Sequence, residues 1–390
     1  MSESASLPTR ARPTEVWPMR LLLLAACVGI VGVFPLHAFG TPHGLGFRAF
    51  ALALAGLGLI TVAGVWTDRP WASWAVMSLV SLKLTVDVYG WATVADRRLA
   101  LLSLVSALVN LVLVALVFRL GPSPRPAPVR LDRVYFACVL ALAAVVGIWG
   151  MFLPGRVAAV LPFGVPPLHA RFLGAMYLSG ATFMLLALRA GRWTALRVVL
   201  PMIAIWTGML GLVSLGHLAA FDWSRTQTWV WFAAYIGYPL LAAWIAWQQR
   251  GAPEPAVERR TSDGLRRYLG VQGVLVTLLA LALLGAPTAM SARWPWAITP
   301  LLAQIYSAPF LSYGLGSLLA SRQPDRAALS IVLPATLVFS AGVLAASARH
   351  AGLFDPGRVA TWLWFGAFGL ATLALAWHLG RPAPVQPSPS

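Results

Sequence analysis

Charged residues are scarce in this sequence. Asp, Glu, Lys and Arg together account for 11% of its 390 residues, whereas soluble globular domains contain roughly 25%. Hydrophobic residues account for 59%, and the mean hydropathy is +0.76. A membrane-spanning helix needs roughly 20 apolar residues, so a chain of this length has room for about twelve spans. We therefore expect an all-α, polytopic membrane protein with little chain left over for a soluble domain.

Cysteine and the common enzyme motifs are also nearly absent. Cys27 and Cys138 fall in apolar runs, where a free cysteine behaves as a small apolar residue, so no disulfide framework is expected. The sequence has no Walker A motif, no glycine-rich dinucleotide fingerprint and no G-x-S-x-G elbow. Its histidines lack the spacing of zinc or haem ligands, so we expect no metal and no cofactor. They are His37, His43, His169, His217, His350 and His378.

Acidic residues are the minority among the charges, with 12 Asp and Glu against 29 Lys and Arg. The arginines cluster between apolar runs, which is a topology signal, and no basic folded domain that would bind nucleic acid is present. Placing the N-terminus inside puts 19 arginines on the cytoplasmic side and nine on the other. We therefore expect both termini in the cytoplasm, an uncleaved first helix and insertion in the plasma (inner) membrane.

Twelve apolar runs are long enough to be helical spans. Proline and glycine inside several of them are compatible with spanning, because neighbouring helices can satisfy the freed backbone groups. The expected spans are about Met19–Phe39, Phe47–Trp66, Trp71–Trp91, Leu99–Leu120, Val134–Leu153, Ala170–Leu188, Leu196–Ala220, Thr228–Trp247, Tyr268–Ala286, Thr299–Ala320, Ala327–Ala348 and Val359–Leu379.

An internal repeat is visible when the sequence is shifted by 133 residues. The shift places Arg133 on Arg266 and Pro154 on Pro287 without a gap. It also carries a rare combination of His, Asp, Arg and Trp from the second third of the chain to the last. We predict three parallel four-helix units at 19–120, 131–250 and 264–380, the first of them diverged, each folded as an up-down bundle. Residues 1–18 and 381–390 are expected to be disordered tails.

The second of these units resembles DoxX-like and related uncharacterised four-helix membrane proteins. The resemblance rests on the segments RFLGAMYLSGATFMLLALRAGRW, GHLAAFDW and TWVWFAAYIGYPLLAAW, through their span lengths and the Arg and Gly near the start of the second helix. It covers one bundle at a time and implies a four-helix unit. That group shares no catalytic motif, so the resemblance implies no activity.

The duplicated element His-x4-Asp-x2-Arg-x2-Thr-Trp-x-Trp-Phe joins two helices on the expected non-cytoplasmic side. The favoured interpretation is structural: the aspartates cap the following helices, and the tryptophans form an interfacial belt. The alternative is a pair of polar pockets that bind an anionic headgroup or small acid, or relay a proton. The first pocket would consist of Arg171, His217, Asp222 and Arg225, and the second of Gln304, His350, Asp355 and Arg358.

Two ionisable residues lie inside the third expected span. Lys83, the single lysine of the chain, and Asp87 are four residues apart and share a helical face. Ionisable groups at that depth are costly, so they are functional candidates by default. Pairing between the two side chains, or snorkelling of the lysine to the interface, explains them equally well. The matching positions of the second unit are Met209 and Val213.

Three functional classes remain open from the sequence. The first is a transporter or permease for a lipid or small molecule, with membrane lipids as its partners. The second is an intramembrane enzyme on a lipid-linked substrate, with His217 and His350 as acid or base. The third is a scaffold for other membrane proteins, for which the polar positions are caps only.

Overall fold

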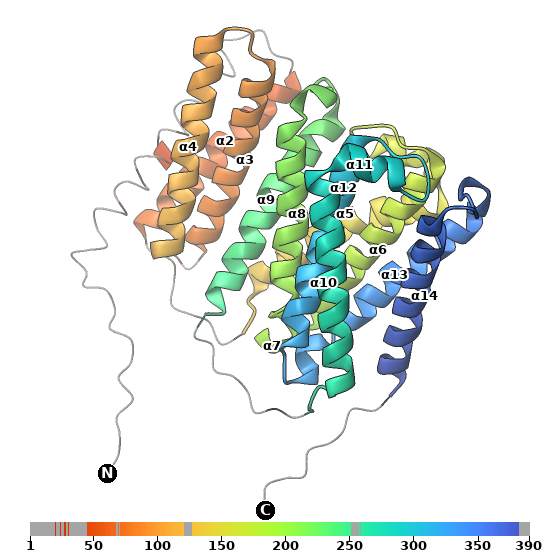
Figure 1. Cartoon of the computed structure of the whole chain (residues 1–390). Coiled ribbons are helices and arrows are strands. Elements are labelled where there is room, and N and C mark those ends of the chain that lie inside the picture. Colours follow the sequence, from red (N-terminus) through yellow and green to blue (C-terminus); the bar gives the residue numbers. More distant parts are fainter. Residues whose placement is uncertain are drawn as a thin grey trace, which may run out of the picture. The chain divides into compact units, whose positions relative to one another are not determined.

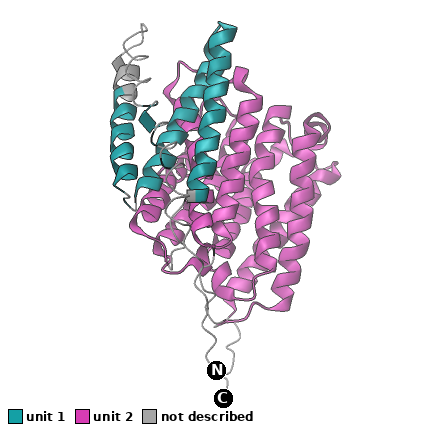
Figure 2. Cartoon of the chain, turned by 90° about the vertical axis from the view of Figure 1, so that its left-hand side faces the viewer, with its two compact units in different colours: residues 1–123 teal, residues 124–390 magenta. Residues whose placement is uncertain are grey.

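The computed structural model describes residues 45–67, 71–120, 127–250 and 259–381, together with positions 20, 24, 27, 28, 30, 69 and 257 (Figure 1). Across these residues the regular elements are helices, and the sole β-bridge is an isolated one between Arg260 and Asp325. The chain divides into two compact units, Met1–Ser123 and Pro124–Ser390 (Figure 2).

Unit 1 contains three described helices. They are α2 (Leu45–Trp66), α3 (Ala72–Thr93) and α4 (Arg97–Leu120), and α3 packs against both of the others. The outward face of α4 is a continuous row of exposed leucine and valine side chains. The expected span Met19–Phe39 lies mostly outside the described residues.

Unit 2 contains eight long helices joined by short helical turns. The first four are α5 (Arg130–Phe152), α6 (Pro167–Arg189), α8 (Val199–Gly216) and α9 (Thr226–Gln248). The last four are α10 (Asp263–Gly285), α12 (Pro300–Ser321), α13 (Val332–Arg349) and α14 (Val359–Gly380). The short elements are η1 (Pro154–Ala159), α7 (Trp193–Leu196), η2 (Leu218–Ala220), α11 (Pro287–Arg293), η3 (Arg326–Leu329) and η4 (Ala351–Leu353). Eleven of the twelve expected spans are thereby confirmed as helices.

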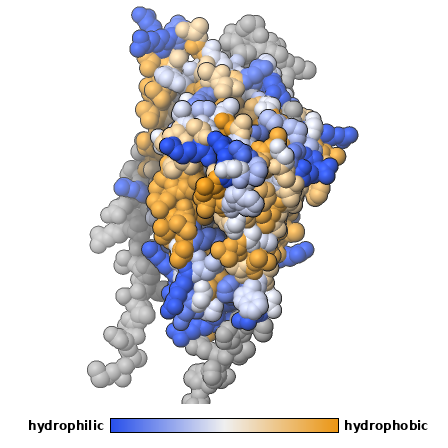
Figure 3. All heavy atoms as spheres, turned by 45° about the vertical axis from the view of Figure 1, so that its right-hand side comes forward, coloured by the Kyte–Doolittle hydropathy of each residue, from blue (hydrophilic) through white to orange (hydrophobic). Residues whose placement is uncertain are grey.

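Eight segments of the described chain are long and apolar enough to cross a membrane. They are Arg97–Arg119, Arg130–Phe152, Pro167–Arg189, Trp193–Gly216, Thr226–Gln248, Asp263–Gly285, Arg326–Arg349 and Val359–Gly380. On the face shown in Figure 3, apolar side chains gather between hydrophilic ends. The chain is an integral membrane protein. Helix α12 falls outside the eight because it is rich in polar residues, which it buries inside unit 2.

The helices of unit 2 pack as four hairpins, and the hairpins of one predicted four-helix unit pack on those of the other. Helix α5 packs on α6, α8 on α9, α10 on α12 and α13 on α14. The strongest contacts between hairpins join α6 to α13 and α12 to α8. The first hairpin of each predicted four-helix unit therefore packs chiefly on the second hairpin of the other, whereas the sequence led us to expect two self-contained bundles.

The bounds of these helices match under the same shift of 133 residues. Helix α5 falls on α10, α8 on α13 and η2 on η4 with identical ends, and α6 and α12 begin at matching residues. Equivalent hydrogen bonds cross between the hairpins: Ser179 donates to the Ala335 carbonyl at 2.5 Å, and Ser312 donates to the Met202 carbonyl at 2.7 Å. The two sets of four helices thus have corresponding elements and corresponding contacts.

Candidate functional site

One end of unit 2, here called the histidine end, contains the duplicated polar element. It comprises residues 154–166, 217–225, 287–299 and 350–358. The Nε2 atom of His350 lies 2.7 Å from Nη1 of Arg171, and Nε2 of His217 lies 2.6 Å from Oε1 of Gln304. Arginine is always a donor and an amide oxygen always an acceptor, so these contacts assign a neutral His350 that accepts at Nε2 and a His217 that donates there.

These pairs differ from the expected pockets. The sequence placed Arg171 with His217 and Gln304 with His350, each within one repeat unit, but the partners are exchanged. The physical reason is the packing of the hairpins: α6 carries Arg171 to the end of α13, and α12 carries Gln304 to the end of α8. Chain proximity suggested the wrong pairing because the second helix of each set packs against the third helix of the other.

The two aspartates stabilise turns and do not contact the histidines. Oδ1 of Asp222 accepts from the backbone N–H of Ser224 at 2.9 Å, and Oδ1 of Asp355 accepts from that of Gly357 at 2.8 Å. Both carboxylates are exposed, and hydrogen bonds from Ser224 lower the pKa of Asp222. The expected helix caps are therefore turn caps placed just before each helix, where arginines occupy the N-cap position.

Arg225 attaches the start of α9 to the α5–α6 connection, and Arg358 attaches the start of α14 to the α10–α12 connection. The Arg225 guanidinium donates to the carbonyls of Leu161 and Pro162, at 3.4 and 3.1 Å. The Arg358 guanidinium donates to the carbonyls of Ala292 and Trp294, both at 3.0 Å. The positive charge of Arg225 also contributes to the lowered pKa of Asp222. At the histidine end the geometry assembles two arginine anchors and two cross-pairs, and the described contacts of His217 and His350 do not include an aspartate.

The neutral state of His350 makes the histidine end sensitive to acid. Burial, Arg171 and Arg349 lower the pKa of His350. The folded state therefore disfavours its protonation, and stability falls as the pH drops from about 6.5, the ordinary pKa of histidine, through the lowered value. We expect the thermal midpoint in detergent to decrease between pH 8 and pH 5, and His350→Gln, which keeps an acceptor for Arg171, to reduce that decrease. An identical decrease in the variant would contradict this assignment.

Lys83 and Asp87 belong to a closed polar network between α3 and α4. The Lys83 ammonium contacts the Asp87 carboxylate directly and donates to Oγ of Ser106 at 2.6 Å. Nδ2 of Asn110 donates to the other carboxylate oxygen at 2.9 Å. Of the three interpretations left open by the sequence, namely function, pairing and snorkelling, the contacts show the pairing. Sequence reasoning missed Ser106 and Asn110, although two polar residues four apart in the apolar run Leu99–Leu120 mark a second polar face.

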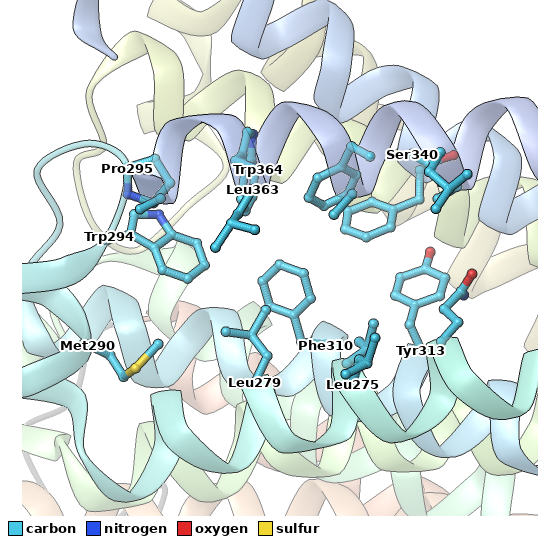
Figure 4. Close-up of a pocket in the computed structure, with 18 of the residues that line it drawn as sticks. Leu275, Leu279, Met290, Trp294, Pro295, Phe310, Tyr313, Ser340, Leu363 and Trp364 are labelled. Atoms are coloured by element: carbon cyan, nitrogen blue, oxygen red, sulfur yellow. The ribbon is translucent and has the colours of Figure 1, made fainter. Parts of the chain in front are cut away.

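A lateral groove of about 870 Å³ lies between α10 and α14 (Figure 4). Leu275 and Leu279 of α10 face Leu363 and Trp364 of α14 across it. Helices α12 and α13 form its floor, and the chain after α11 closes it at the histidine end. Because α10 and α14 present exposed apolar residues at its margin, the groove opens sideways on the surface that would face lipid. These exposed residues include Val271, Leu275, Leu363 and Leu370. We call this cavity the α10–α14 groove.

The corresponding space in the other half of unit 2 is bridged. The hydroxyl of Tyr135 on α5 donates to the carbonyl of Tyr238 on α9 at 3.0 Å, and the two rings are 6.0 Å apart. Under the shift of 133 these residues correspond to Tyr268 and Ala371, both of which line the groove. An alanine thus lines the groove at the position where the other half has a tyrosine.

Three polar atoms along the groove are buried and have no hydrogen-bond partner among the described residues. They are the hydroxyl of Tyr268, Oε1 of Gln272 and Nε1 of Trp294. Buried polar groups are nearly always hydrogen-bonded in folded proteins, so unpartnered ones in a cavity indicate where a ligand's polar atoms can bind. Two arginines, Arg293 and Arg358, also line the groove at the histidine end.

Comparison with protein-family models, with curated proteins and with solved structures found no match. The resemblance to DoxX-like proteins therefore stays a prediction. Within the part of the chain that the structure describes, no three His, Cys, Asp or Glu residues group together as metal ligands do.

Proposed function

We propose that this protein is a permease for lipids or lipid-like small molecules, and that the α10–α14 groove takes up the hydrophobic part of the cargo from the bilayer. The groove carries this proposal. Its volume of about 870 Å³ falls in the range of roughly 300–1,000 Å³ that is typical of ligand sites. Its lining is mostly aliphatic and aromatic, as a site for hydrocarbon requires.

The groove is long enough to hold a lipid chain across one leaflet of a membrane. Its lining on α14 runs from Val359 to Ala371, which at about 1.5 Å per residue is roughly 18 Å. Half of a hydrocarbon core is roughly 15 Å thick. A lipid chain can thus lie along α14 from the histidine end to the middle of the bilayer without leaving the apolar environment.

The matching halves support a duplicated architecture. We propose that α5–α9 and α10–α14 are copies of one four-helix unit and that residues 19–120 are a diverged third. An even number of spans gives successive copies the same orientation. We place the protein in the plasma membrane with both termini in the cytoplasm. In this orientation the histidine end faces outward, and the groove takes up lipid from the outer leaflet.

The geometry gives less support to the other two classes. Catalysis by His217 or His350 calls for a partner that orients the imidazole for proton transfer, and each is instead held by a side chain of the opposite hairpin, Gln304 or Arg171. A scaffold requires no cavity. The open groove with its unpartnered polar atoms therefore favours cargo binding.

Closing the groove tests this function. Ala371→Tyr introduces the residue that stands at the matching position, Tyr238, so the substituted protein should fold. We expect it to lose lipid that is retained by the wild type, measured by native mass spectrometry from mild detergent, and to slow lipid exchange between the leaflets of reconstituted vesicles at least roughly tenfold.

The matched control is Leu373→Tyr. Leu373 is on the same helix and is 72% exposed, so the added ring lies outside the groove. We expect this variant to retain lipid and to move it at the wild-type rate. Equal lipid retention in Ala371→Tyr and wild type would show that the groove is not the binding site.

A further inference from the structure

The charged end of the α10–α14 groove differs from its counterpart in a way that identifies the headgroup of the cargo. Arg293 and Arg358 both line the groove there, and both side chains are exposed. Neither forms an ion pair with an acidic group among the described residues. The Asp355 carboxylate accepts from the Gly357 backbone. Two cations thus stand beside an apolar cavity without a countercharge from the fold.

Most of the hydrogen-bonding capacity of these two guanidinium groups remains available. Arg358 uses its two Nη atoms for the carbonyls of Trp294 and Ala292, and Arg293 makes a hydrogen bond of 3.3 Å to the carbonyl of Ala289 in its own helix. A guanidinium carries five N–H donors in a planar fork that matches phosphate oxygens. The bonds of Arg358 orient its group and leave donors for a ligand.

The adjoining indole supplies a third donor. Trp294 is 3% exposed and lines the groove, and its Nε1 has no partner among the described residues. The groove also reaches the start of α14, where Val359 and Ala360 line it. The first backbone N–H groups of a helix form its positive end and favour an anion. The positive groups and the N–H donor therefore converge on the same end of the cavity.

The α5–α9 half of unit 2 has different residues at two of these positions. Under the shift of 133 residues, Arg293 and Trp294 correspond to Val160 and Leu161. The third position is an arginine in both halves: Arg225 is the counterpart of Arg358, and each donates to a carbonyl of the first interhelical connection in its own half. The additional arginine and the indole thus occur in the half that contains the groove. The Trp294 ring also packs on Trp296 and Trp364, which holds the indole in place at the edge of the cavity.

We propose that the α10–α14 groove selects anionic phospholipids: Arg293, Arg358 and the Trp294 indole bind the phosphate region while one acyl chain lies along α14. This proposal rests on the proposed function, because it names the headgroup of the lipid whose chain fills the groove. Arginine binds phosphate through charge-assisted hydrogen bonds, which are roughly twice as strong as neutral ones. A zwitterionic phospholipid has the same phosphate but brings a cation toward two arginines.

The test uses the full-length protein in nanodiscs that contain equal amounts of phosphatidylglycerol and phosphatidylcholine. Native mass spectrometry after release in mild detergent gives the ratio of the two lipids retained. We expect phosphatidylglycerol to predominate in the wild type, and the Arg293→Gln/Arg358→Gln variant to lower the ratio roughly tenfold while the total lipid retained changes little.

Two variants make the outcome unambiguous. Arg156→Gln/Arg349→Gln removes the same charge from exposed positions at the histidine end that do not line the groove, and it should leave the ratio unchanged. Arg293→Gln alone loses just one bond within its own helix. It should fold and lower the ratio even where the double variant, which releases the connection held by Arg358, does not fold.

The results separate the headgroup from the groove. An unchanged ratio in Arg293→Gln and the double variant, together with loss of both lipids in Ala371→Tyr, overturns the headgroup proposal and leaves the function standing. Retention of both lipids in Ala371→Tyr overturns the function itself. A competition with inorganic phosphate gives a further check. If phosphate abolishes the preference for phosphatidylglycerol equally in Arg293→Gln and in the wild type, the selectivity lies elsewhere on the protein.

Discussion

Lys83→Met is expected to loosen the α3–α4 hairpin strongly. The change leaves the Asp87 carboxylate, 4% exposed, with Asn110 as its remaining hydrogen-bond partner in the network. Removing one partner of a buried ion pair costs about 3 kcal/mol, because the other charge stays buried without compensation. We expect amide hydrogen exchange in α3 and α4 of the full-length protein to rise by roughly a hundredfold.

The double variant Lys83→Met/Asp87→Asn provides the control. It removes both charges, and an amide at position 87 can still bond to Asn110, so we expect a loss of about 1 kcal/mol. Equal exchange in the single and double variants would show that the ion pair does not hold this hairpin. Lipid movement in the double variant tests the transport role of the pair separately, because movement at the wild-type rate in a folded protein excludes that role.

Gly174→Ala is expected to destabilise unit 2 although alanine is the better helix former. A Cβ atom at Gly174 would lie 2.3 Å from the backbone nitrogen of Met151 and 2.6 Å from the carbonyl carbon of Gly150. Backbone atoms cannot turn away as a side chain can, so α5 and α6 must move apart at their closest approach. Overpacking of this kind costs about 3 kcal/mol, and the thermal midpoint in detergent should fall by several degrees.

Gly270→Ala is the matched control for this substitution. Gly270 lies inside α10, and no atom stands within 4 Å of an added Cβ atom there. With no clash, the higher helix propensity of alanine should leave the free energy of unfolding unchanged or raise it by up to about 1 kcal/mol. The thermal midpoint should therefore stay the same or rise. A midpoint for Gly174→Ala as high as that of Gly270→Ala would contradict the close approach of α5 and α6.

Much of the fold could be predicted from local sequence. The expected spans Thr228–Trp247 and Val359–Leu379 differ from α9 and α14 by at most two residues at each end, because a run of apolar residues forms a helix in lipid whatever packs against it. The break before α8 was missed. The expected span Leu196–Ala220 begins within α7 and ends within η2, since an apolar composition continues through both turns.

The candidate site was predicted in part. The sequence indicated correctly that Arg171, Gln304 and the two histidines lie at one end of the helices. It did not indicate that Arg171 pairs with His350 and Gln304 with His217, because these pairs depend on which hairpins pack against each other. The groove was not predicted at all, since a cavity in an apolar protein is lined by the same residue types as a filled core.

The sequence by itself determined that this chain forms apolar helices, and it revealed that the markers of α5–α9 recur 133 residues later in α10–α14. Both follow from information carried along the chain, namely hydropathy and spacing. The tertiary structure alone decided the pairing of Arg171 with His350 and the opening between α10 and α14. These depend on packing between helices that are distant along the chain, which hydropathy and spacing do not specify.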